Sequence, residues 1–384
     1  MAIAGRELLG VLVLAYYRGW RGRVLRVDTG HVLTALVEVV KPPFARSLEG
    51  VDQTRAGSIV EPIANVAAAS HSDPFVAEVD RLLREVVWVA RHKLYRGFSE
   101  PAPAWSDDVR CAVKVALIEG EAAGVQHCHP AHLFAGLASE ENRAVALCRA
   151  AGFDPQMFVS QLRDGVMARE GLPHSVGLGV WEKTGVIGRP QSAVSRLRGA
   201  STRVRLARWR PNGFQPVAFA VTREAVRQAV RLDAEQVEAW HVLLALLVLH
   251  DQSLEIGLRL RGRWESHNEG GQLLKASGAS VGNVADLLSE PAYRKATAAS
   301  SESRMPARSR SDPPFGQDVV EVERRAQHIA KRAGHYNVGT LHILLSLLQD
   351  PAGGAKRAMS AVGVDVLALS DEALRKLKVF SSDL

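Results

Sequence analysis

Four side chains of the types that bind zinc lie close together in the sequence. His127, Cys128, His129 and His132 offer nitrogen and sulfur ligands, which zinc accepts. A closed zinc site normally combines two separated ligand clusters, and this is a single cluster. The pattern favours a polar loop between helices, and we predict neither a metal nor a cofactor.

A second candidate matches the nucleophile elbow of serine hydrolases. Residues 278–282 read Gly-Ala-Ser-Val-Gly, but that elbow requires a preceding strand and a placed His and acid. Residues 273–276, Leu-Leu-Lys-Ala, indicate a helix instead. The carboxylate pairs at 107–108 and 140–141 are typical of helix N-termini, where negative charge is favourable. We predict no enzymatic activity.

Arginine accumulates near the middle of the chain. No acidic residue occurs between Glu182 and Glu224, and Trp209 lies among the arginines. Such a segment is either a solvated basic linker or a surface for nucleic acid phosphates or an acidic protein. The predicted basic patch consists of Arg196, Arg198, Arg203, Arg205, Arg208 and Arg210.

The composition is that of a globular protein. The 384 residues are 47% hydrophobic and 23% charged, and this length suffices for two domains of roughly 150 residues each. Aromatic residues make up only 6%, and apolar residues seldom alternate with polar ones, which favours helix over sheet. The formal net charge is +7.

Cysteine usage and apolar runs indicate the compartment. Cys111, Cys128 and Cys148 are an odd number, which argues against a disulfide framework and favours the reducing cytoplasm. The densest apolar runs, 8–15 and 242–249, are far shorter than the roughly 20 residues of a membrane-spanning helix. We therefore expect no membrane partner.

The elements that position these side chains are repeated. Four segments share a His, two apolar residues, a variable residue, a small residue and a Leu. The small residue allows a neighbouring helix to approach closely, and the apolar residues share one helical face. The four histidines are His31, His132, His241 and His342, and the small residues are Ala35, Gly136, Ala245 and Ser346.

Each segment is followed by a Gly, an apolar residue and usually Asp. Gly ends one helix in the left-handed conformation, and Asp or Ser caps the next. An amphipathic stretch precedes each segment, so each repeat is predicted to contain about four helices. The turns begin at Gly50, Gly152, Gly278 and Gly363.

The predicted fold is therefore all-α, with four divergent four-helix repeats forming two tandem modules. Insertions separate the copies, because the histidines lie 101, 109 and 101 residues apart. The first module covers 1–168, with repeats at about 1–70 and 104–168 and an extra helix over 73–95. An Arg-rich linker or insertion covers 169–214. The second module covers 215–384, with repeats at about 215–290 and 315–380 and a flexible linker over 293–314.

These repeats resemble the N-terminal repeat domain of the Clp unfoldases. That family's motif is Val-Gly-Thr-Glu-His before a Leu-rich helix, followed by Leu-Gly-Val-Asp. The fourth copy is nearest to it, with Val-Gly-Thr-Leu-His at 338–342 and Val-Gly-Val-Asp at 362–365. The sequence contains no Gly-x-x-x-x-Gly-Lys-Ser/Thr phosphate loop. The resemblance thus implies the binding part of an unfoldase without its ATPase motor.

The resemblance also implies a binding position. Some family members bind phosphorylated arginine through the Glu before the motif His, but here no copy has that carboxylate. Trp240 and Leu341 would make this surface apolar, and the alternative is that both pack against a neighbouring helix. The predicted partner-binding residues are Thr29, Gly30, Ala131, Trp240, Thr340 and Leu341.

The predicted function is protein binding by a regulator, adaptor or decoy of Clp-dependent proteolysis. The expected partners are proteins or peptides, including Clp subunits or their substrates. The alternative is a basic nucleic-acid-associated protein that uses the Arg-rich segment.

Overall fold

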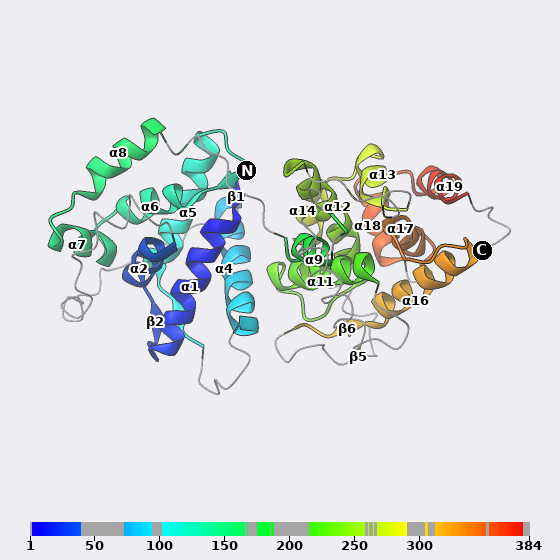
Figure 1. Cartoon of the computed structure of the whole chain (residues 1–384), viewed down its shortest axis with the longest axis horizontal. Helices are drawn as coiled ribbons and strands as arrows, with labels where there is room; N and C mark the ends of the chain where they lie inside the picture. The colour runs from blue at the N-terminus through cyan, green and yellow to red at the C-terminus, as the bar shows by residue number, and fades with distance from the viewer. Residues whose placement is uncertain are drawn as a thin grey trace, which may run out of the picture. The chain divides into compact units, whose positions relative to one another are not determined.

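The structure is a computed structural model. It describes residues 2–39, 73–93, 102–165, 167, 175–184, 186–187, 215–257, 260, 264, 267–289, 304–305, 312–350 and 353–378. Helices form almost all of its regular structure, which confirms the all-α prediction (Figure 1). The chain divides into two compact units, unit 1 (1–174) and unit 2 (175–384).

Four helices of equal length begin the predicted repeats. Each has 16 residues, and the motif histidine lies 25 positions after its first residue, as in 6 to 31 and 317 to 342. This common spacing supports four copies, although their number stays a prediction. The four are α1 (Arg6–Arg21), α5 (Asp107–Ala122), α11 (Pro216–Arg231) and α16 (Gln317–Arg332).

The motif histidines lie in the first turn of a second set of helices, each packed against the helix before it. The small motif residue sets the distance between the two: a Cβ on Gly136 would lie 1.9 Å from the carbonyl oxygen of Ala112. In the fourth copy, Ser346 Oγ donates a hydrogen bond to Val322 O at 2.8 Å. The second helices are α2 (Thr29–Val39), α6 (Pro130–Ala138), α12 (Ala239–Glu255) and α17 (Thr340–Leu348).

The predicted Gly turns join the remaining helices. Gly152, Gly278 and Gly363 have φ of +74°, +95° and +83°, a conformation that L side chains rarely adopt. Asp365 then caps its helix by accepting hydrogen bonds from Leu367 N and Ala368 N. The turn at 50–52 lies outside the described residues. These helices are α7 (Arg143–Ala150), α8 (Pro155–Gly165), α13 (Gly270–Ala276), α14 (Val281–Ser289), α18 (Gly354–Ala361) and α19 (Val366–Leu377).

Short strand pairs tie the copies together within each unit. In unit 1 the segment before each first helix pairs with the segment before the other copy's second helix, and the bridge from Val237 to Phe315 repeats one of these pairings in unit 2. The parallel pairs are β1 (Ile3–Ala4) with β4 (His127–Cys128), and β2 (Arg26–Val27) with β3 (Ala104–Trp105). An antiparallel pair joins β5 (Arg304–Met305) to β6 (Phe315–Gly316).

Among the described residues, each unit contains one further helix. In unit 1, α4 (Pro74–Lys93), the extra helix expected over 73–95, packs against α1 and α5. In unit 2, α9 (Val176–Thr184) packs against α11, within the segment expected to be a linker or insertion. Gly177 permits this approach, because a Cβ there would lie 2.9 Å from Ala220 O. No helix among the described residues is long and apolar enough to cross a membrane.

Candidate functional site

The repeated histidine caps the helix that it begins. In three copies its Nδ1 accepts a hydrogen bond from the backbone N–H three residues earlier, at 2.9 Å for His132 and His241 and 2.8 Å for His342. In the first copy Nδ1 of His31 instead donates to Asp28 Oδ1. The side chain thus takes the place of the Glu or Gln of a capping box. The motif histidine is therefore structural.

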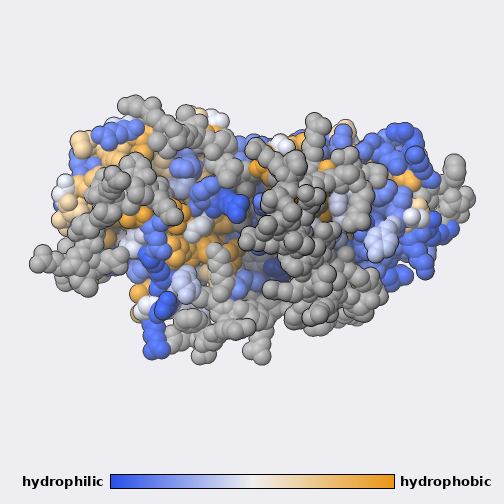
Figure 2. All heavy atoms as spheres, viewed as in Figure 1, coloured by the Kyte–Doolittle hydropathy of each residue, from blue (hydrophilic) through white to orange (hydrophobic). Residues whose placement is uncertain are grey.

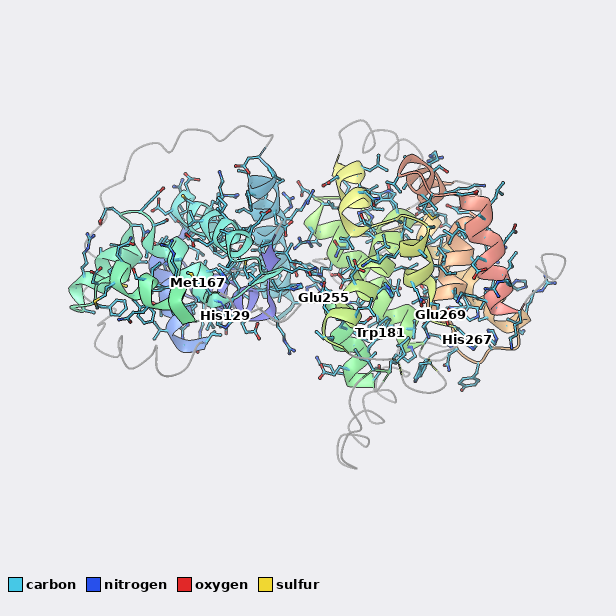
Figure 3. All side chains as sticks on the ribbon, turned by 90° about the horizontal axis from the view of Figure 1, so that it is seen from above. His129, Met167, Trp181, Glu255, His267 and Glu269 are labelled. Carbon is cyan, nitrogen blue, oxygen red and sulfur yellow. The ribbon has the colours of Figure 1, made fainter. Side chains whose placement is uncertain are left out.

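This cap requires the neutral imidazole with its proton on Nε2. His132 Nε2 lies 3.0 Å from Met167 O, close to the loop that carries His129 (Figure 3). Burial lowers the pKa of His241 well below its usual value. Burial and two nearby histidines lower the pKa of His342 to about 3. Among the described residues, no three His, Cys, Asp or Glu side chains are arranged to hold a metal ion.

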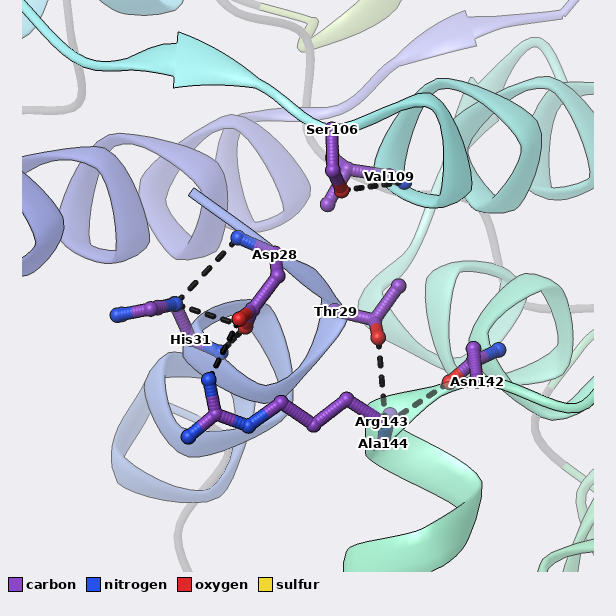
Figure 4. A network of polar contacts seen from close by, with 8 residues as sticks. All are labelled: Asp28, Thr29, His31, Ser106, Val109, Asn142, Arg143 and Ala144. Carbon is purple, nitrogen blue, oxygen red and sulfur yellow. Dashed lines mark hydrogen bonds and ion pairs between the residues drawn. The ribbon is translucent and has the colours of Figure 1, made fainter. Parts of the chain in front are cut away.

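A polar network joins the two copies of unit 1 at the N-terminus of α2 (Figure 4). Arg143 Nη1 donates to Asp28 Oδ2 at 2.6 Å, and His31 Nδ1 lies 2.8 Å from Asp28 Oδ1. Burial alone would raise the pKa of Asp28, but these hydrogen bonds outweigh it and lower the pKa to about 2. Thr29 Oγ1 accepts a hydrogen bond from Ala144 N, so the first copy caps a helix of the second.

The corresponding threonine joins the copies of unit 2. Thr340 Oγ1 accepts from Gly270 N at 3.0 Å, and Leu341 N donates to His267 O at 3.0 Å. The His335 ring stacks on His267, and its Nδ1 lies 2.8 Å from His342 Nε2. Because His342 carries its proton on Nε2, it donates to His335 and has no lone pair for a metal there.

The six predicted partner-binding residues are buried. Trp240 is 4% exposed and donates to the Glu238 carboxylate through its indole N–H. Leu341 is 0% exposed. Both values agree with the alternative that these side chains pack against neighbouring helices. Thr29, Gly30, Ala131 and Thr340 are buried as well. Each of the two threonines accepts a hydrogen bond from a backbone N–H of the other copy in its unit.

An apolar pocket lies between α11 and α16 in unit 2. The space within it is about 20 Å³, enough for roughly one water molecule, and valine and alanine side chains dominate its lining. Thr222, Glu323 and Gln327 supply its polar groups. In the view of Figure 2, the described surface near α16 and α19 is mostly hydrophilic. The other lining residues are Ala218, Val221, Val242, Val319, Val322, Ala326, Val338 and Ile343.

This pocket was not predicted from the sequence, although the sequence contains a signal for it. The seventh residue of the first helix is Leu12 and Val113 in unit 1, but Thr222 and Glu323 in unit 2. A polar residue at a helix position that is apolar in the other copies indicates that the side chain is less buried there than in those copies.

Two further predictions concern other parts of the chain. The six arginines of the basic patch lie outside the described residues, so that patch stays a prediction. Ser280, within the Gly-Ala-Ser-Val-Gly segment, accepts a hydrogen bond from Asn283 N at the start of α14. The segment is the helix turn expected from the repeat.

Comparisons with known proteins bear on the C-terminal copy. A family model described as Clp repeat (R) N-terminal domain matches residues 314–383. Among solved structures, the chain is similar to the N-terminal domain of the caseinolytic protease associated chaperone ClpD from Arabidopsis thaliana. The match has 20% sequence identity and a TM-score of 0.28, and covers 42% of this chain and 94% of that one. No curated protein matches the chain.

Proposed function

We propose, because residues 314–383 match the Clp repeat N-terminal domain, that the chain is a non-enzymatic protein-binding module that regulates Clp-dependent proteolysis. In this role it binds Clp subunits or their substrates as an adaptor or decoy. A cytoplasmic location is part of the same proposal.

The pocket between α11 and α16 is the observation that supports the proposal most directly. Five of its eleven lining residues come from α16, within the matched region. Its floor is apolar, and Glu323 and Gln327 line it from α16. Desolvated apolar contacts surrounded by polar groups are the usual source of affinity in protein interfaces.

Site-directed photocrosslinking tests the proposal with the full chain. A photoreactive amino acid replaces Gln327, and purified Clp ATPase and an unfolded substrate protein are each added. The matched control places the same amino acid at Leu367, which is 75% exposed on α19. We expect crosslinks to one of the two proteins from position 327 only. Equal crosslinking from both positions, or none from 327, would contradict the proposal.

The nucleic-acid alternative has a different signature. Binding through the Arg-rich segment would weaken steeply with salt, because counterions are released from the phosphates. It would also be insensitive to substitutions in the pocket. No observation on the described residues favours this alternative.

A further inference from the structure

The turn after the first helix carries an exposed apolar side chain in two of the four copies. Leu25 is 88% exposed and Tyr336 is 89% exposed, and these are the most exposed large apolar side chains that the structure describes. Both lie six residues before a motif histidine, so they occupy the same position in the first and fourth copies. The second and third copies have the polar residues Gln126 and Glu235 there. One turn in each unit therefore presents an apolar side chain to solvent.

Contacts on both sides hold the Leu25 side chain outward. The turn joins α1 to β2 (Figure 1), and Val24 N donates a hydrogen bond to Gly19 O at 3.0 Å. Leu25 O accepts a hydrogen bond from Ala104 N at 3.0 Å, and the Val27 side chain that follows is 0% exposed. A side chain on an already ordered backbone loses little freedom on binding, so more of its contact energy remains for affinity.

The turn of Tyr336 is ordered in the same way. His335 N donates to Ala330 O at 2.8 Å, which is the bond that the turn of the first copy makes at the equivalent positions. Val338 is 4% exposed, and its N–H donates to the Gln215 side chain at 3.0 Å. The two turns thus present their apolar side chains on equivalent backbones.

Basic side chains flank both apolar residues. Arg21 and Arg26 are exposed on either side of Leu25 in the sequence, and neither side chain pairs with another described residue. In the fourth copy, the exposed residues Lys331 and Arg332 end α16, just before the turn. A positive surface around an apolar centre favours a partner with acidic side chains beside its own apolar one.

The charge of each turn extends to a residue with a strained backbone. Two residues before the position described above, the second and fourth copies have Gly124 and Gly334, with φ of +72° and +71°. The first and third copies have Arg23 and Asp233 there, both with φ of +58°, a conformation that L side chains rarely adopt. Arginine thus lies in the basic turn of the first copy, despite a backbone that favours glycine. Such strain is typical of functional positions.

We propose that the turns of Leu25 and Tyr336 each bind a segment of a partner protein in which acidic side chains flank an apolar one. This inference rests on the proposed protein-binding function and names the chemistry of the partner. The segment buries the apolar side chain of the turn, and its carboxylates pair with the basic side chains around it. The apolar centre favours a protein over a nucleic acid, because contacts to phosphates gain nothing from a leucine.

A synthetic peptide tests the proposal with the full chain. The probe is a labelled peptide with a central Phe between two Asp-Glu pairs, and its binding is measured by fluorescence anisotropy. We expect the double variant Leu25→Ser, Tyr336→Ser to bind about tenfold more weakly, because the central apolar contact is lost. Both side chains are exposed, so the substitutions leave the core intact. The matched control is Leu367→Ser, the same change at an exposed leucine of α19.

A charge reversal tests the basic side chains separately. In the Tyr336→Ser background, Arg21→Glu with Arg26→Glu should weaken the remaining binding by about tenfold, because like charges then meet. The control is Lys356→Glu, a reversal at an exposed residue of α18, which should leave binding unaltered. A peptide in which Lys replaces the acidic residues should not bind.

Three results would overturn the proposal: no binding of the acidic peptide, equal binding of its lysine version, or no effect of the double serine variant. Labelled single-stranded DNA is the remaining comparison. If the DNA binds more tightly than the peptide, loses binding on the arginine reversal and is insensitive to Leu25→Ser, the turn contacts phosphates and the proposal is wrong.

This inference and the proposed function can fail separately. If proteins crosslink to position 327 but the acidic peptide does not bind, only this inference fails. If the peptide binds through Leu25 and Tyr336 but neither Clp ATPase nor unfolded substrate crosslinks, the turns accept an acidic segment and the assignment to Clp-dependent proteolysis fails.

Discussion

Lowering the pH from 7 to 5 should destabilise unit 2, because its capping histidines are neutral when folded. The pKa of His342 is about 3 in the folded state and about 6.5 in an unfolded chain. Below pH 6.5 the unfolded state therefore binds a proton that the folded state does not. Stability falls as the pH decreases, by about 1.4 kcal/mol for each pH unit per histidine.

The size of the effect follows from these two values. Protonation of the unfolded state at His342 costs folding about 0.2 kcal/mol at pH 7 and about 2 kcal/mol at pH 5. The expected loss is thus about 2 kcal/mol from this residue. His241 is fully buried and its pKa is also lowered, so it adds a loss in the same direction.

Urea unfolding at pH 7 and at pH 5 measures this loss of stability. Hydrogen exchange of the α17 amides at the same two pH values assigns the loss to unit 2. The control is His342→Gln, because a Gln side chain accepts the same capping hydrogen bond but does not titrate near neutral pH. We expect the variant to be less sensitive to pH by about 2 kcal/mol. The same pH dependence in the variant and in the original chain would refute the reasoning.

Three further substitutions test contacts within the units. Thr340→Val leaves the buried N–H of Gly270 without its acceptor and should destabilise unit 2 by about 1–3 kcal/mol; an unchanged urea midpoint would contradict the role of this threonine. Gly136→Ala forces a Cβ against Ala112 O and should cost unit 1 about 1–3 kcal/mol by calorimetry, whereas a neutral effect would show that α5 and α6 can separate freely. Glu224→Gln removes a buried carboxylate that accepts from Ser175, Arg227 and Gln228 and should cost about 3–5 kcal/mol, and α9 should exchange its amide protons faster. Slow exchange of α9 in that variant would contradict its anchoring by Glu224.

The helices and turns were predictable because their signals are local. Periodic apolar residues, a Gly in the left-handed conformation and an Asp cap act within a few residues, so the all-α class and the turns at 152, 278 and 363 follow from the sequence. Helix α9 was not predictable in this way. It is short and contains two glycines, and it is held by Glu224, which lies 47 residues beyond Gly177.

The candidate site was also predictable only in part. The sequence indicated that four histidines begin four helices, and that Trp240 and Leu341 either face a partner or are buried. Only the tertiary structure decided for burial, because exposure depends on which helices pack over a residue and not on the residue itself.

By itself the sequence determined the repeated unit: an amphipathic stretch, a segment with a His and a small residue that lets a neighbouring helix approach, and a Gly turn. The structure showed that the first helix has 16 residues and that the histidine caps the second. The tertiary structure decided that α4 packs against α1 and α5 in unit 1 and that a small pocket lies between α11 and α16 in unit 2. The physical reason is that a helix's own stripe of residues predicts that it must pack, whereas its partner is selected by shape and charge across long sequence separations.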